Sequence, residues 1–122
     1  MAGPTQQCGS VGPKALVSRV DSAVAELADR LPSAEPRPVH LPFWGSWSLT
    51  LHDLLVTRMM ELAVHSDDLA VSVGIATPQL PQIAVDAVID LLARVAVRRH
   101  GATGVLRALS RAERAPPSIA AF

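Results

Sequence analysis

Four polar side chains, at spacings of three, four and three residues, carry the chemistry that this sequence offers: Arg58, Glu61, His65 and Asp68. On an α-helix, residues four apart lie about 40° apart around the axis and one turn apart along it, so Glu61 and His65 can point at one site. A carboxylate and a neutral imidazole are both ligands for zinc, and two ligands from one helix need a third from elsewhere to leave an open position for water or substrate. A Glu and a His at this spacing also form an ordinary surface hydrogen bond, or a charge pair with an arginine such as Arg58. The spacing by itself leaves both interpretations open.

The other histidines and the cysteine indicate no second site. His40 lies in a proline-rich segment, and His52 and His100 stand at the ends of expected helices, so we expect each to be structural or exposed. Cys8 is the only cysteine, which excludes an intrachain disulfide and a structural zinc site built on thiolates. Its glycine- and proline-rich surroundings indicate a flexible tail residue. A single cysteine is typical of a reducing, cytoplasmic setting.

Composition excludes several classes of protein. The chain has 122 residues, with eleven basic and eleven acidic side chains. Zero net charge argues against a nucleic-acid partner, and the length predicts one domain. Hydrophobic residues make up 49% and charged residues 18%, so the chain is too apolar to be disordered throughout. No apolar run approaches the ~20 residues that span a bilayer, so we expect no membrane partner.

The pattern along the chain predicts a mainly α protein. Residues 1–13 are expected to form a disordered leader, because glycine and proline recur there without hydrophobic periodicity. An amphipathic helix is expected over residues 14–31, ended by Pro32. The prolines of residues 32–50 forbid a helix, so we expect a loop there with one or two short strands and a small hairpin that turns at residues 44–46.

The stripe of polar residues falls on the second expected helix, over residues 51–73. Thr50 is its expected N-cap, with Asp53 three residues on, and Gly74 is its C-terminal glycine. A bend is expected near residues 65–67, since serine and aspartate favour a fresh N-cap. The core side of this helix is predicted from four leucines, Leu51, Leu55, Leu62 and Leu69. Because the polar stripe borders these leucines, we expect the candidate site to lie partly inside a helical bundle.

A third helix is expected after Pro81, running to about His100, with apolar residues on two sides. Its core stripe is predicted as Leu80, Ala84, Ala87, Leu91 and Val95, and its second apolar side as Val85, Ile89 and Val97. Such a helix is central in a bundle or packs against another subunit. Gly101 and Gly104 are expected to break the chain before a short basic helix over residues 105–114, and residues 118–122 are expected to be a tail.

The run LHDLLVTRMMELAVHSDDLAVSVG, residues 51–74, resembles the signature of the mycothiol-dependent maleylpyruvate isomerase family, within the DinB-like metal-binding helical-bundle superfamily. The shared pattern is an Arg, a Glu, a His four residues later, an Asp-Leu pair and a closing Gly. The ending RHGATGVLRALSRAERAPPSIAAF is similar to that of actinobacterial members. The resemblance extends over residues 14–122 and predicts a partial DinB-like metal-binding domain there.

The resemblance implies a divalent metal, most often zinc, held by three protein ligands in a bundle cavity. Glu61 and His65 match two of the family's ligands. Mycothiol is the implied co-substrate, and the bound metal would lower the pKa of its thiol. The resulting thiolate could add reversibly to an activated double bond and permit cis-trans rotation, so an isomerase or transferase is implied.

The family's first histidine ligand stands on a helix that precedes the stretch matched here, and nothing before Ala15 matches it. Three explanations remain: a shortened or remnant chain with an inactive site, a site completed by a second subunit, or a substitute ligand such as His40 or His52. We favour the first. The alternative to a thiol-linked metal protein is a non-catalytic helical protein that self-associates as a homodimer, or binds a partner, through the apolar second side of its third helix.

Overall fold

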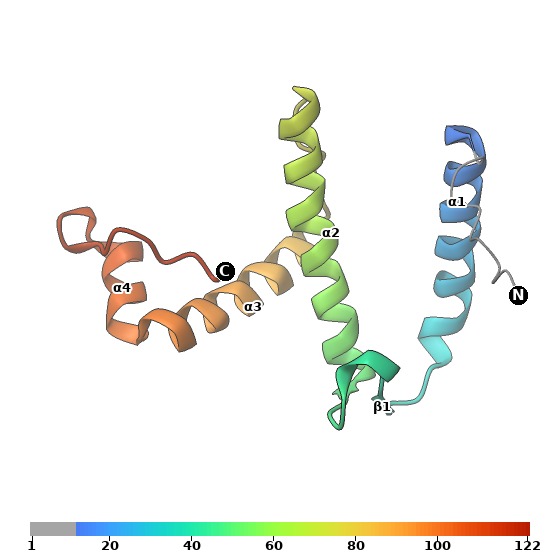
Figure 1. Ribbon diagram of the computed structural model, residues 1–122, viewed down its shortest axis with the longest axis horizontal. Helices are drawn as coiled ribbons and strands as arrows, with labels where there is room; N and C mark the ends of the chain where they lie inside the picture. The colour runs from blue at the N-terminus through green and yellow to red at the C-terminus, as the bar shows by residue number, and fades with distance from the viewer. Residues whose placement is uncertain (1–11) are drawn as a thin grey trace, which may run out of the picture. The chain divides into compact units, whose positions relative to one another are not determined.

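The computed structural model describes residues 12–122 (Figure 1). They are mainly α-helical, with one small two-stranded antiparallel sheet, as the sequence predicts. The chain divides into two compact units, one ending at Pro36 and the other spanning Arg37–Phe122. Most of the expected leader, Cys8 included, lies outside the described residues. None of the described helices is long and apolar enough to cross a membrane.

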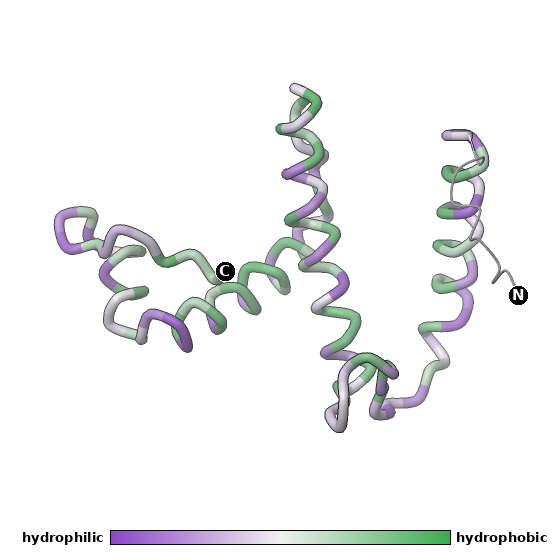
Figure 2. The backbone as a smooth tube through the Cα atoms, in the orientation of Figure 1, coloured by the Kyte–Doolittle hydropathy of each residue, from purple (hydrophilic) through white to green (hydrophobic). Residues whose placement is uncertain are grey.

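In the first unit, helix α1 spans Pro13–Arg30 and is followed by a 3-10 turn at Leu31–Ser33. It begins one residue earlier than predicted because Pro13 takes the first helical turn, where its missing N–H leaves no hydrogen bond unmade. Apolar and polar residues both recur along the whole length of this helix (Figure 2). The helix contains no buried residue, and its apolar stripe of Leu16, Val20, Val24 and Leu27 is exposed.

The second unit opens with the predicted hairpin. Strand β1, Pro38–Val39, pairs antiparallel with β2, Leu49–Thr50, with Val39 opposite Leu49. Each strand has two residues, and Pro42–Trp44 form a 3-10 turn between them. The rings of Trp44 and Trp47 stack with centroids 4.4 Å apart, and Trp47 remains 52% exposed. His40 Nδ1 donates a hydrogen bond to the Trp47 carbonyl oxygen at 2.8 Å, so this histidine closes the hairpin.

Helix α2 spans Leu51–Val73, the range predicted from its caps. The Thr50 hydroxyl oxygen accepts a hydrogen bond from the Asp53 N–H at 3.0 Å. Gly74 adopts the left-handed conformation, with φ of 71°, and its N–H closes the last turn. The helix is continuous through residues 65–67, so no second helix begins there.

The core side predicted for α2 agrees with the structure at Leu51 and Leu55, which are half-buried, but is wrong by one position farther along the helix. Leu62 and Leu69 are 70% and 66% exposed. Helix α3, Gln82–His100, packs against α2, and Ala70 is the residue of α2 that becomes fully buried. Val56, Ala63 and Ala70 also recur every seven residues, and their smaller side chains let the two helix axes approach closely.

Helix α4 spans Ala102–Ser110 and packs against α3. It begins earlier than predicted, and Gly104 lies inside it rather than breaking the chain. A 3-10 turn follows at Ala112–Arg114. The core of the described residues contains four buried side chains, which come from α2, α3 and α4: Ala70, Val88, Ala96 and Val105. Of the core stripe predicted for α3, Leu80 lies before the helix and the others are half-buried.

Gly101 turns the chain between α3 and α4 in a conformation that other residues avoid. Its φ is 81° and its ψ 150°, a region that is essentially confined to glycine and costs other residues about 1–3 kcal/mol. An added Cβ would meet no atom within 4 Å, so the cost of a side chain is purely conformational. We expect Gly101→Ala to lower the free energy of unfolding by about 1–3 kcal/mol, measured by urea denaturation.

Gly104→Ala is the matched control for this prediction. Gly104 lies within α4 and its added Cβ also meets open space. Alanine is favoured over glycine inside a helix by about 0.5–1 kcal/mol, so this variant should be slightly more stable than the parent. Equal effects of the two substitutions would contradict the conformational argument.

Candidate metal centre

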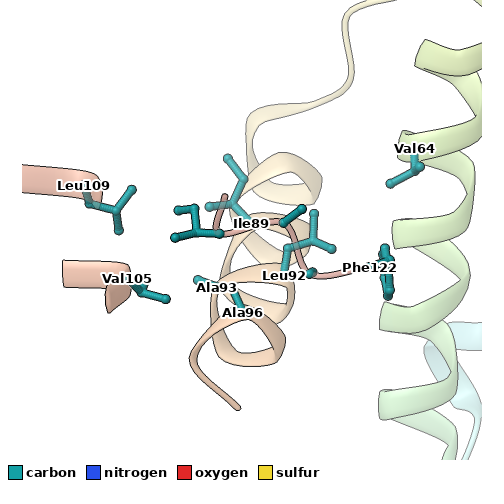
Figure 3. A pocket seen from close by; sticks show the side chains of 11 residues that line it. Val64, Ile89, Leu92, Ala93, Ala96, Val105, Leu109 and Phe122 are labelled. Carbon is teal, nitrogen blue, oxygen red and sulfur yellow. The ribbon is translucent and has the colours of Figure 1, made fainter. Parts of the chain in front are cut away.

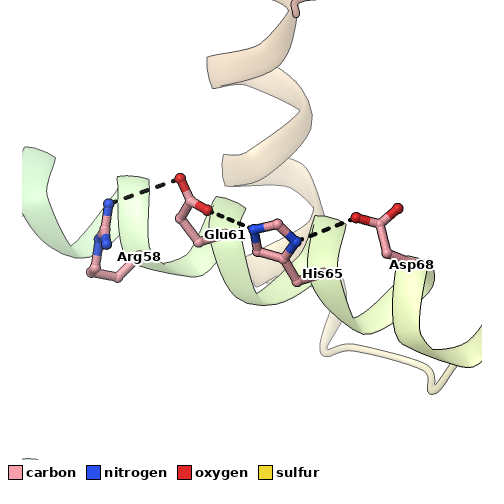
Figure 4. Close-up of polar contacts among 4 residues, drawn as sticks. All are labelled: Arg58, Glu61, His65 and Asp68. Atoms are coloured by element: carbon pink, nitrogen blue, oxygen red, sulfur yellow. Dashed lines mark hydrogen bonds and ion pairs between the residues drawn. The ribbon is translucent and has the colours of Figure 1, made fainter.

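The four polar side chains of the predicted stripe lie along one face of α2 and touch in sequence (Figure 4). His65 Nε2 lies 3.0 Å from Glu61 Oε2, and His65 Nδ1 lies 3.3 Å from Asp68 Oδ2. Arg58 Nη2 lies 3.9 Å from the other Glu61 oxygen. The spacing of three, four and three residues places all four groups on one face, as predicted from the helical period.

His65 is held between two carboxylates, one on each ring nitrogen. Both contacts can be hydrogen bonds only if both nitrogens carry a proton. A neutral ring carries a proton on only one nitrogen, so one of the two carboxylates then faces a lone pair. In the tautomer that carries its proton on Nδ1, the ring donates to Asp68, and a cation between Nε2 and Glu61 takes the place of the missing proton. A metal-binding histidine commonly donates its other N–H to a carboxylate, which fixes the ring, and Asp68 is placed for that role.

The distance between Glu61 and His65 suits a shared ion. Zinc bound tetrahedrally at about 2.0–2.2 Å from nitrogen and oxygen ligands holds neighbouring donor atoms about 3.3 Å apart. The observed separation of 3.0 Å therefore needs to open by only a few tenths of an ångström. Both side chains belong to one helix, so a rotamer adjustment suffices.

The face that carries these groups is open to solvent. The His65 side chain is 65% exposed and that of Glu61 is 42% exposed. The expectation that the site lies partly inside a bundle is therefore wrong for this unit, because α3 packs on the side of α2 that contains Ala70 rather than beside Leu62 and Leu69. Exposed ion pairs contribute at most about 1 kcal/mol to stability, so substitutions here test function rather than folding.

The described part of the chain supplies two metal ligands and no third. Within residues 12–122, no group of three or more His, Cys, Asp or Glu side chains could hold a metal ion. Asp68 contacts the nitrogen of His65 that faces away from Glu61, so it cannot join them. A metal would thus find an incomplete set of ligands among these residues of a single copy.

The two proposed substitute histidines cannot reach the pair within one chain. His52 lies on the same continuous helix as His65, and thirteen residues at 1.5 Å each separate them by about 20 Å along the axis. His40 lies in the hairpin that precedes the helix, where its ring is bonded to Trp47. His40 and His52 are therefore excluded as the missing ligand within one chain.

An apolar cavity of about 370 Å³ lies elsewhere in the second unit (Figure 3). Its wall combines Val64 of α2, Ile89 and Leu92 of α3, Leu109 of α4, and the C-terminal segment that ends at Phe122. That segment, expected to be a free tail, returns to α3. His100 Nε2 donates a hydrogen bond to the Ala120 carbonyl oxygen at 2.7 Å, and Arg99 donates to Ala121 at 3.4 Å. This return was not predicted from the sequence, although the residues after Pro117 are mostly apolar.

The chain matches a known protein family over half of its length. A family model described as the mycothiol maleylpyruvate isomerase N-terminal domain matches residues 9–70. The chain belongs to this family. No curated protein and no solved structure gives a match.

The stretch matched to the mycothiol maleylpyruvate isomerase family contains the whole polar stripe, from Arg58 to Asp68, and ends inside α2. Helices α3 and α4 lie beyond it. The resemblance seen in the sequence is confirmed as far as residue 70, and this stretch includes Glu61 and His65. The resemblance over residues 71–122 stays a prediction.

Proposed function

We propose that this protein binds a divalent metal ion, zinc in the first instance, through Glu61 and His65. The observation that carries the proposal is the position of the His65 ring, with Glu61 on one nitrogen and Asp68 on the other. This arrangement presents one lone pair and one carboxylate to a shared cation while the remaining N–H is held in place. It lies within the stretch that matches the family.

The family supports mycothiol as the co-substrate and a thiol-dependent isomerase or transferase as the class of reaction. The same relationship, together with the single cysteine, favours the cytoplasm of an actinobacterium as the setting. Because residues 12–122 of one chain supply only two ligands, the proposal for a single copy stops at metal binding. Small-molecule thiols and substrates, rather than nucleic acid or membrane, are the partners that it implies.

The direct test is a zinc titration of the untagged full-length chain in competition with a chromophoric chelator. We expect saturable zinc binding. Glu26→Gln is a matched control, since Glu26 forms an exposed ion pair four residues from Arg30 on α1, and it should bind zinc as the parent does. Absence of binding at saturating zinc would overturn the proposal.

A second candidate function is non-catalytic self-association through the apolar second side of α3. It is favoured by the exposure of Ile89 and Val97, two of the three residues predicted for that side. This candidate needs no metal. Sedimentation of the zinc-free chain as a monomer at high concentration would contradict it.

A further inference from the structure

We propose that a second copy of this chain completes the metal site, by pairing the α2 helices of two copies antiparallel with their polar stripes face to face, about a two-fold axis that crosses the helices at the level of Ala63. The inference rests on the proposed metal binding by Glu61 and His65. It adds that the ion is shared between two chains, each of which supplies the same two ligands.

The number of ligands supports a site that is shared between two chains. Closed zinc sites have four ligands in a tetrahedron. Glu61 and His65 are two, and no third donor within residues 12–122 joins them. Two copies related by a two-fold axis supply two glutamates and two histidines, which is a complete tetrahedral set. Such a closed site leaves no open position for a thiol, so an ion shared in this way holds the two chains together rather than activating mycothiol. Closed two-fold symmetry is also the commonest arrangement of identical chains.

The charge pattern of α2 also supports this pairing, because two antiparallel copies of the helix place groups of opposite charge against each other. Glu61 and His65 lie two residues before and after Ala63, and Arg58 and Asp68 lie five before and after it. In an antiparallel pair centred on Ala63, Glu61 of each copy faces His65 of the other. Arg58 likewise faces Asp68 of the other copy. Each pairing therefore joins a carboxylate to a basic group, which favours this register over its neighbours.

An apolar border along one side of the polar stripe also supports this pairing. Leu62 and Leu69 are 70% and 66% exposed, and they follow Glu61 and Asp68 by one residue each, so they lie on the same edge of the stripe. A two-fold axis perpendicular to the pair of helices keeps the leucines of both copies on the same side of the contact. They can then pack together and exclude water from that side of the ion.

The apolar border is small, since it contains two leucines from each chain. Association by this surface alone should be weak, because stable interfaces usually bury a much larger area. The ion supplies the remaining interaction. The pairing is therefore expected to depend on zinc.

The test is sedimentation of the untagged full-length chain with and without zinc, with the bound metal counted by mass spectrometry. We expect a monomer in chelator and a dimer with one zinc per two chains when zinc is added. Leu62→Gln keeps both ligands and should raise the dissociation constant of the zinc dimer by about tenfold. Leu106→Gln, at an exposed leucine of α4, is the control and should leave the dimer unchanged.

One zinc per chain, in a monomer or a dimer, would overturn the shared site and leave metal binding by Glu61 and His65 intact. No zinc binding would overturn both. A dimer that forms equally well in chelator would overturn the shared site and favour association through α3. Equal effects of Leu62→Gln and Leu106→Gln would overturn the α2 interface.

Discussion

His65→Ala should weaken zinc binding by at least about 100-fold. Loss of a group that only orients a metal ligand already costs about 10- to 100-fold in affinity, and His65 is itself one of the two ligands that each chain supplies. The substitution also removes the partner that holds Asp68, so no carboxylate is positioned in its place. The measurement is the competition titration with a chromophoric chelator.

The fold should survive this substitution, because His65 is 65% exposed and surface changes usually alter stability by less than about 0.5 kcal/mol. Circular dichroism should therefore show the helical content of the parent. His52→Ala is the matched control: it removes a histidine from the same helix, but about 20 Å away. An unchanged zinc affinity in His65→Ala, or an equal loss in His52→Ala, would contradict the assignment.

Val88→Asp should unfold the unit that spans residues 37–122. Val88 is 5% exposed and is one of only four buried side chains among the described residues. A buried carboxylate without a partner costs several kcal/mol, which is comparable to the whole stability of a small domain, about 5–15 kcal/mol. We expect the cooperative thermal transition, followed by circular dichroism, to disappear.

Ile83→Asp makes the same kind of change on the same helix at a position that is 82% exposed. Its carboxylate stays in water, so the melting temperature should stay close to that of the parent. Both variants place an aspartate in α3, so a difference between their melting temperatures reports the burial of the side chain rather than the helix propensity of aspartate. A normal melting transition in Val88→Asp would show that the packing of α3 against α2 and α4 is not the core of this unit.

The ends of α2 could be predicted from sequence because short-range signals determine them. Thr50 and Gly74 bracket α2 at the predicted residues, since a hydroxyl cap and a left-handed glycine act within one turn. The face that packs could not be predicted in the same way. Two apolar rows on α2 share a period of seven residues, and the choice between Leu62 and Ala63 depends on the partner helix, which the local pattern does not specify.

The candidate site shows the same division. Helical spacing correctly placed Glu61 beside His65, because both groups belong to one rigid element. Whether that face is buried depends on the position of α3, and the expectation failed there. The return of the C-terminal segment to His100 was also missed, because a contact between residues twenty positions apart leaves no periodic signal.

X-ray absorption at the zinc edge of the loaded, untagged protein reports the atoms around the metal and therefore tests metal binding by Glu61 and His65. We expect a shell of nitrogen and oxygen at about 2.0–2.2 Å, with the outer-shell scattering of an imidazole that disappears in His65→Ala. A sulfur neighbour at about 2.3 Å would place the zinc on Cys8 instead. A shell without imidazole scattering, or one unchanged in His65→Ala, would contradict metal binding by Glu61 and His65.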